Sequence, residues 1–145
     1  EVLVIDLDIR PHNREAIESH PMSKRISMIE GSSIDEATIA QVRAIAEGKK
    51  VILVLDSNHT HDHVLAELRA YAPLVAVDSY CVVMDTVVED MPAEFFPDRP
   101  WGPGDNPKTA VWEYLKENSD FEIDQQMQDK LLLSVAPDGY LRRIR

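Results

Sequence analysis

Residues 51–65 read VILVLDSNHTHDHVL, and this stretch decides the fold. The apolar run 51–55 predicts a short strand buried on both faces, as strands of parallel sheets are. Asp56 ends the strand, and Ser57 or Asn58 can cap the helix that follows. The apolar side of this predicted helix is formed by Val64, Leu65, Leu68 and Tyr71. A strand, an acid and an amphipathic helix in this order indicate one strand–helix unit of an α/β sheet.

The same unit recurs on both sides of this stretch. We predict strands at 2–5, 25–29, 51–55, 80–83, 121–123, 131–135 and 140–144. We predict helices over about 13–19, 34–45, 58–72 and 107–115, the last with a buried side of Val111, Trp112, Tyr114 and Leu115. This alternation predicts an α/β fold with a mostly parallel sheet and right-handed crossovers. The turn signal Pro137-Asp138-Gly139 predicts an antiparallel C-terminal edge.

Length and composition indicate a single globular domain over residues 1–145. The formal net charge of −11 argues against nucleic acid and anionic membranes as partners. No apolar stretch is long enough for a membrane span, and no signal peptide is recognisable. Cys81 is the one cysteine, so we expect no internal disulfide and a small buried hydrophobe in a reducing, cytoplasmic compartment.

Small or acidic residues stand at the ends of four consecutive predicted strands. They are Asp6 with Asp8, Gly31-Ser32-Ser33, Asp56 with His59, and Asp85. Ligands of open α/β sheets bind beyond the carboxyl ends of the strands, so these residues are the candidates for a binding site. Each acid taken singly can equally be a strand terminator or a helix cap.

The first two strand ends suit a nucleotide cofactor. Asp6 fits the acid that accepts both hydroxyl groups of a ribose, whereas Asp8 fits a solvated turn. Gly31-Ser32-Ser33 allows the backbone to approach an adenine edge, to cap the next helix, or to do both.

The next two strand ends suit a metal ion or acid–base chemistry. Asp56 and Asp85 would end neighbouring strands and can share a Mg²⁺ ion, the alternative being two helix caps without a metal. His59 and His63 have a helical spacing that zinc sites use, but no cysteine or third ligand accompanies them. We therefore predict that His59 acts as a general base on a substrate hydroxyl.

A long predicted loop runs from Glu89 to Asn106. Loops of about twenty residues are uncommon in compact domains and are often functional. It contains Trp101-Gly102-Pro103-Gly104, which can form a lid or a substrate wall, or a rigid surface connection.

Several segments together resemble the cephalosporin hydroxylase / rhamnosyl O-methyltransferase family. The most specific is 56–64, and the others are 5–14, 67–75, 79–80, 85–86, 101–104, 106–107 and 137–143. The resemblance implies a Rossmann-like class I methyltransferase sheet that binds S-adenosylmethionine. It places the ribose at Asp6 and the adenine at Gly31-Ser32-Ser33.

The resemblance also implies a metal site, with one departure. The family uses an aspartate at the position of Asp56 and an acidic pair at the end of the next strand. Here that pair reads Met84-Asp85, and a thioether is a poor Mg²⁺ ligand. The site can persist on Asp56 and Asp85 or be free of metal.

A second departure concerns the start of the chain. The family's first strand and its glycine-rich loop precede the strand that opens this sequence, and both are missing here. We expect a fragment of a longer protein, or a chain that pairs its exposed strand edges with another copy as a homo-oligomer. Alone, it should bind the cofactor poorly.

The leading hypothesis is O-methyl transfer to a hydroxyl of a sugar or a glycosylated natural product. His59 would remove the proton, and Mg²⁺ at Asp56 and Asp85 would orient and acidify the hydroxyl. The family name also includes a hydroxylase, but no iron-binding triad is evident. A degenerate, non-catalytic domain used in assembly is the alternative, and Met84 favours it.

A haloacid-dehalogenase-type phosphatase is a further alternative. The motif Asp6-x-Asp8 resembles its nucleophile motif, with Ser57, Lys108 and Glu89-Asp90 in the remaining roles. The spacing of these residues fits that class poorly.

Overall fold

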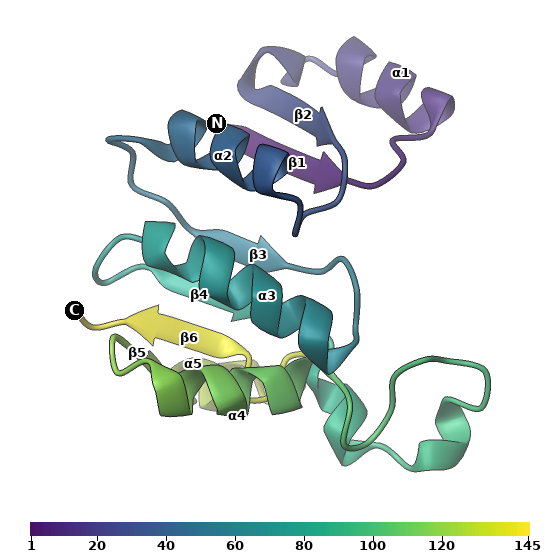
Figure 1. The fold of residues 1–145 in the computed structure, drawn as a ribbon, viewed down its shortest axis with the longest axis vertical. Helices are drawn as coiled ribbons and strands as arrows, with labels where there is room; N and C mark the ends of the chain where they lie inside the picture. Colours follow the sequence, from purple (N-terminus) through teal and green to yellow (C-terminus); the bar gives the residue numbers. More distant parts are fainter. The chain divides into compact units, whose positions relative to one another are not determined.

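The computed structural model describes all of residues 1–145, which form two compact units, Glu1–Ile45 and Ala46–Arg145. The first unit is drawn in purple and blue in Figure 1, and the second continues through teal and green to yellow. Each unit has a sheet of its own. The expectation of one domain over 1–145 stays a prediction.

The first unit is built on two parallel strands, as the sequence predicts. Strands β1 (Val2–Asp6) and β2 (Ile26–Glu30) pair in register, with Val4 opposite Met28. Helix α1 (Pro11–Ser19) connects them through the short helix η1 (Ser23–Arg25), and α2 (Glu36–Ala46) follows β2. Helix α1 begins at Pro11 rather than near Asn13, because proline suits the first helical turn, where no N–H donor is needed.

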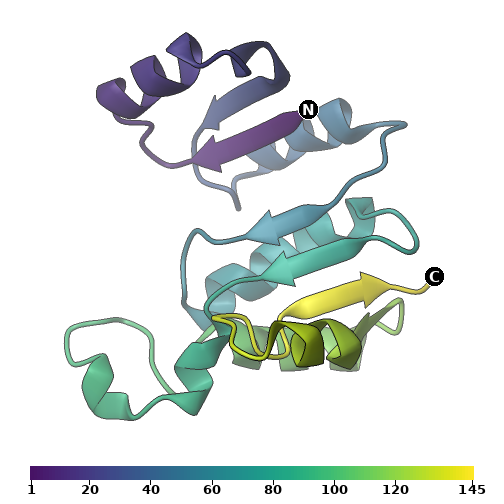
Figure 2. The same cartoon turned by 180° about the vertical axis from the view of Figure 1, so that it is seen from behind.

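The second unit has a four-stranded sheet in the order β3-β4-β6-β5. Its strands are β3 (Leu53–Leu55), β4 (Tyr80–Val83), β5 (Phe121–Ile123) and β6 (Tyr140–Arg143). Strands β3 and β4 are parallel, whereas β6 is antiparallel to both β4 and β5. Figure 2 shows β6, in yellow, running opposite to the two teal strands. The predicted parallel pairing and antiparallel C-terminal edge are confirmed.

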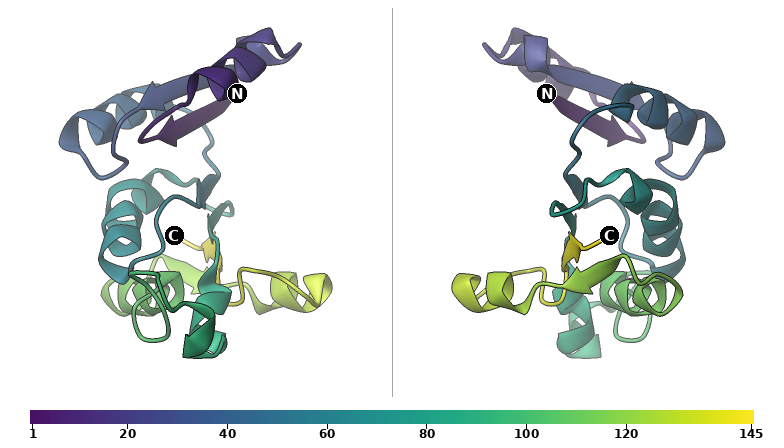
Figure 3. Two further views of the ribbon diagram at one scale, coloured as in Figure 1. Left: turned by 90° about the vertical axis from the view of Figure 1, so that its right-hand side faces the viewer. Right: turned by 90° about the vertical axis from the view of Figure 1, so that its left-hand side faces the viewer.

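Helices cover both faces of this sheet. The α-helices that do so are α3 (His61–Tyr71), α4 (Pro107–Glu117) and α5 (Gln125–Leu131). The short helices of this unit are η2 (Ala72–Leu74), η3 (Thr86–Asp90) and η4 (Ala93–Phe95). Figure 3 shows α3 and α4 on one side of the sheet and α5 on the other. No helix combines the length and the apolar character that crossing a bilayer requires.

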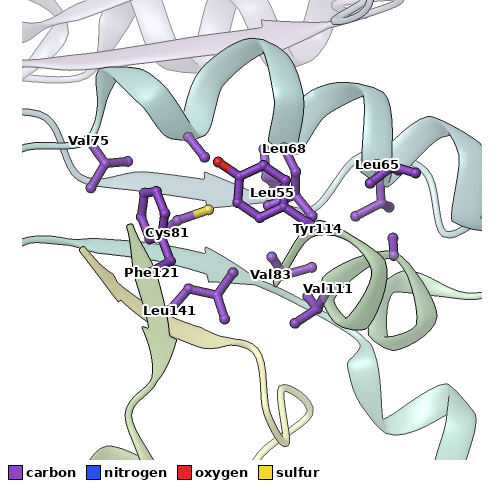
Figure 4. Packing of buried hydrophobic residues seen from close by; sticks show 13 residues of the cluster. Leu55, Leu65, Leu68, Val75, Cys81, Val83, Val111, Tyr114, Phe121 and Leu141 are labelled. Carbon is purple, nitrogen blue, oxygen red and sulfur yellow. The ribbon is translucent and has the colours of Figure 1, made fainter. Parts of the chain in front are cut away.

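The core of the second unit lies between the sheet and helices α3 and α4. Figure 4 shows Leu55 and Cys81 of the sheet close to Leu68 and Tyr114 of the two helices. Leu68 and Cys81 are fully buried, and burial raises the pKa of the Cys81 thiol. The predicted inward residues of α3, namely Val64, Leu65, Leu68 and Tyr71, are all buried.

The strand predicted at 51–55 is shorter, β3 covering Leu53–Leu55, and it is not buried on both faces, since Ile52 is 64% and Val54 58% exposed. Three further local predictions are wrong. The expected strand at 131–135 is the end of α5 followed by irregular backbone, because β6, its expected hairpin partner, is paired with β4 and β5 on its two sides. The expected caps Ser57 and Asn58 precede the observed N-cap of α3, Thr60. Trp112 remains 40% exposed, with the Lys108 ammonium 5.7 Å from its ring centroid.

Candidate functional site

The end of β1 and the start of the segment after β2 lie side by side in the first unit. The Gly31 amide donates a hydrogen bond to the Asp6 carbonyl at 2.9 Å, which brings these two candidate residues together. The Asp8 amide donates to Asp6 Oδ1 at 3.1 Å. The second carboxylate oxygen of Asp6 makes no hydrogen bond within the chain, and the residue is exposed. Asp8 stabilises the turn, in keeping with its predicted role.

Gly31 has a backbone conformation that favours glycine. Its φ angle is 155°, and an added Cβ would lie 3.1 Å from the Thr38 hydroxyl. Ser32 accepts a hydrogen bond from the Asp35 amide, which leads the chain into α2. Gly31, Ser32 and Ser33 are half-buried, so their backbone can be reached only partly from solvent.

A cavity of about 250 Å³ lies in the first unit, next to Asp6. Apolar side chains of β1, β2 and α1 line most of it, and Asp6 and Asn13 supply its polar groups. Its volume is below the range of about 300–1,000 Å³ that is usual for small-molecule pockets.

In the second unit, the ends of β3 and β4 bring three predicted residues together. The strands are parallel neighbours with Leu55 opposite Val83, so Asp56 and Asp85 emerge at the same edge. One ligand atom from each of Asp56, His59 and Asp85 lies within 4.8 Å of the others. Neither carboxylate caps a helix with its side chain, since Thr60 precedes α3 and η3 has no side-chain cap. Asp85 stands at the N-cap position of η3 without a side-chain capping bond, and a metal held by Asp56 and Asp85 stays a prediction.

Asp85 is held in an unusual backbone conformation. Its φ angle of 54° is left-handed, a region that aspartate tolerates better than most residues. Its Oδ2 lies 2.7 Å from His59 Nε2. An ionised carboxylate can only accept hydrogen bonds, so this contact favours the tautomer with the proton on Nε2. His59 Nδ1, which makes no hydrogen bond within the chain, then carries the lone pair.

Asp56 is influenced by both of its neighbours. Partial burial and the charge of Asp85 raise the pKa of Asp56, and hydrogen bonding with Asp85 adds to the rise. The nearby His59 opposes it. Asp56 therefore keeps its proton to a higher pH than an ordinary aspartate.

The His59 ring is also held by an aromatic contact. The Trp101 ring stacks on it, with centroids 4.9 Å apart and an interplanar angle of 28°. The Arg99 guanidinium lies 5.2 Å from the centroid of the same Trp101 ring. The length and the glycines of the loop that carries Trp101 indicate a functional segment, but they do not predict that Trp101 contacts His59.

The other two histidines of segment 59–63 contact different residues. His61 bonds Thr109 Oγ1 at 2.8 Å and lies 3.2 Å from the Glu113 carboxylate, so it links α3 to α4. His63 lies 3.5 Å from the carboxylate of Glu67. His59 precedes α3, so the helical zinc-type pair of His59 and His63 does not form.

Glu67 is a polar residue that the sequence analysis missed. It is buried in α3 and accepts a 2.7 Å hydrogen bond from the Ser57 hydroxyl, which tethers the segment after β3. A glutamate among apolar helical positions is only a weak indication of a buried polar contact, since its partner lies in a loop.

Lys108, the candidate phosphatase lysine, is likewise buried and paired with Asp90 at 2.8 Å.

Comparison with known proteins places the chain in a family. The family described as Rhamnosyl O-methyltransferase/CmcI matches residues 1–144. Proteins named rhamnosyl O-methyltransferase from Mycobacterium tuberculosis (strain ATCC 25618 / H37Rv) and Mycobacterium bovis (strain BCG / Pasteur 1173P2) are each 32% identical over 121 residues, covering 81% of this chain and 47% of the relative. The protein of that name from Mycobacterium leprae (strain TN) is 30% identical over 123 residues, covering 81% and 50%. The chain spans about half the length of these curated relatives. It belongs to the Rhamnosyl O-methyltransferase/CmcI family.

Proposed function

We propose that this protein is an S-adenosylmethionine-dependent O-methyltransferase that acts on a hydroxyl of a sugar or a glycosylated natural product. The observation that carries the proposal is the 2.7 Å bond between His59 and Asp85 at the carboxyl ends of β3 and β4. The relatives' name, rhamnosyl O-methyltransferase, supports a sugar hydroxyl as the acceptor.

His59 would accept the proton of the acceptor hydroxyl at Nδ1. Asp85 accepts a hydrogen bond from Nε2–H and so stabilises the imidazolium that forms, because the opposite charge is only one hydrogen bond away. When bound, S-adenosylmethionine would supply the methyl group to the hydroxyl oxygen from a positively charged sulfur, and it would leave as a neutral thioether without further activation.

The residues of the first unit fit the adenosine part of this cofactor. The free oxygen of the exposed Asp6 carboxylate can accept hydrogen bonds from ribose hydroxyls. Gly31 lies beside it without a side chain, so that the backbone of Gly31, Ser32 and Ser33 can approach the adenine.

Asp56 and Asp85 fit a divalent cation such as Mg²⁺, because an oxygen of each lies within 4.8 Å of the other and of a ring nitrogen of His59. A bound Mg²⁺ would acidify the acceptor hydroxyl and orient it. Met84 offers no oxygen, so water and substrate would have to complete the coordination. This departure favours the second candidate function, a degenerate domain that serves assembly.

Calorimetry of the full-length protein with S-adenosylmethionine, with and without Mg²⁺, separates the two candidates. Binding followed by methyl transfer to a rhamnoside is the expected result. His59→Ala should lower kcat by about 10²- to 10⁴-fold, the usual range for a general base. His12→Ala, an exposed histidine of α1, is the matched control. Absence of binding in both conditions would contradict the methyltransferase, and equal effects of the two variants would contradict the role of His59.

A further inference from the structure

We propose that Trp101 is a positioning residue: it fixes the plane of the His59 ring so that Nε2 stays bonded to Asp85 and Nδ1 stays available. This inference rests on the proposed role of His59 as proton acceptor. It follows from the stacked contact, at 4.9 Å and 28°, and from the way in which the Trp101 loop is anchored.

His59 needs such a support because its own segment constrains it little. It lies in the connection between β3 and α3, outside regular structure. Its single hydrogen bond, to Asp85, fixes the position of Nε2 but leaves the ring free to rotate about that contact. The flat Trp101 ring opposes this rotation, because turning the imidazole about its bond to Asp85 would break the stacking of the two rings.

Trp101 itself is followed by a tight turn. The Gly102 amide donates to the Asp105 carbonyl at 2.9 Å, and the Asp105 amide donates back to the Gly102 carbonyl at 3.0 Å. Gly104 has a φ angle of 90°, which favours glycine, and its amide donates to the Glu89 carboxylate at 2.7 Å. The turn is therefore closed on itself and tied to Glu89 of η3.

A fully buried asparagine joins this turn to α4. Asn106 Nδ2 donates to the Gly102 carbonyl at 2.9 Å and to the Glu89 carboxylate. Its Oδ1 accepts from the Lys108 and Thr109 amides and so caps α4. The loop that carries Trp101 thus shares its hydrogen bonds with the first turn of a helix.

A hydrogen bond also joins the chain segment that carries Trp101 to the one that carries His59. Asp105 Oδ1 accepts a 2.7 Å hydrogen bond from the amide of His61, two residues after His59. This bond ties the turn that follows Trp101 to the start of α3. The segments that carry the two rings are therefore held together by hydrogen bonds, and the stack is supported by the fold around it.

A substrate wall is the competing role for Trp101. The ring is half-buried and already contacted by two groups, His59 and the Arg99 guanidinium at 5.2 Å. A wall would contribute mainly to binding of the acceptor, and its loss would raise KM. A positioning residue contributes to the orientation of the base, and its loss lowers kcat instead.

The test compares Trp101→Ala and Trp101→Phe with Trp112→Ala, a control at the exposed tryptophan of α4. The readouts are the NMR resonances of the His59 ring protons, assigned with His59→Ala, and kcat and KM for the acceptor. Calorimetry with S-adenosylhomocysteine checks that each variant keeps its fold. We expect Trp101→Ala to abolish the ring-current shift of His59 and to lower kcat by about 10- to 100-fold, with KM nearly unchanged. Trp101→Phe should retain most of the activity, and Trp112→Ala should change none of these quantities.

Two results would overturn the inference: His59 resonances that do not move in Trp101→Ala, or a rise in KM at constant kcat. Failure of the proposed function has a different signature. If the protein is not a methyltransferase, the wild type neither binds S-adenosylmethionine nor transfers a methyl group, and if His59 is not the base, His59→Ala remains fully active, whatever Trp101→Ala does to the resonances.

Discussion

Asp85→Asn tests the proposed chemistry most directly. The substitution keeps the shape of the side chain, and asparagine tolerates the left-handed backbone at φ 54° as well as aspartate does. It removes the negative charge that faces the His59 imidazolium at 2.7 Å. A hydrogen bond to a charged group contributes about 1.5–3 kcal/mol. At about 1.4 kcal/mol per factor of ten, kcat should fall roughly 10- to 150-fold.

The assay is steady-state methyl transfer, with binding of S-adenosylhomocysteine measured in parallel. Asp78→Asn is a closely matched control, because Asp78 is exposed, has a φ angle of 63° and precedes β4 at its opposite end. Since Asp85 would also hold a cation, Asp56→Asn is measured with and without Mg²⁺. We expect it to abolish any dependence on Mg²⁺ and to reduce kcat less than Asp85→Asn does. A kcat for Asp85→Asn within a factor of about two of the wild type would refute the reasoning, as would an equal loss in Asp78→Asn.

Three further outcomes are expected. Leu68→Ala should lower the free energy of unfolding by about 2–5 kcal/mol in urea titrations, because this core side chain is fully buried and its loss leaves a cavity. The hydrogen bond from the Tyr80 hydroxyl lowers the pKa of Asp124, so the resulting stability is present above about pH 4 and is lost as the pH falls through the lower, folded pKa. Tyr80→Phe should therefore destabilise the protein more at pH 7 than at pH 2. Asp6→Asn should weaken binding of S-adenosylhomocysteine in calorimetry, whereas Asp8→Asn should leave it unchanged, because Asp8 contributes its amide rather than its carboxylate to the turn.

The strand–acid–helix pattern was sufficient to predict most of the fold. Strand 51–55 and strand 80–83 were expected to be parallel neighbours, and β3 and β4 are. The failure at 131–135 has a physical cause that a local pattern does not contain. The apolar run Leu131-Leu132-Leu133 has strand character, but the partner it would need, β6, is already paired on both edges.

The same distinction applies to the candidate site: its contacts that follow from strand pairing were predictable, and those that depend on loops were not. The proximity of Asp56 and Asp85 was predictable, because adjacent parallel strands deliver their ends to one edge. The bond between His59 and Asp85 was not, since it depends on the left-handed backbone at Asp85. The stack of Trp101 on His59 depends on a loop whose course is set by hydrogen bonds to Glu89 and Asn106. Contacts of that kind are properties of the folded chain and leave no periodic pattern in the sequence.

The position of Asp85 in fact depends on the C-terminal segment. The Val83 amide donates to the Gly139 carbonyl at 2.8 Å, and a Cβ on Gly139 would lie 2.1 Å from the Val83 carbonyl oxygen. On the other side of Asp85, the fully buried Thr86 donates its hydroxyl to the Pro137 carbonyl at 2.6 Å. The turn 137–139 therefore holds the backbone on both sides of the carboxylate that bonds His59. Because only glycine fits at 139, the antiparallel edge is part of what orients the proposed base.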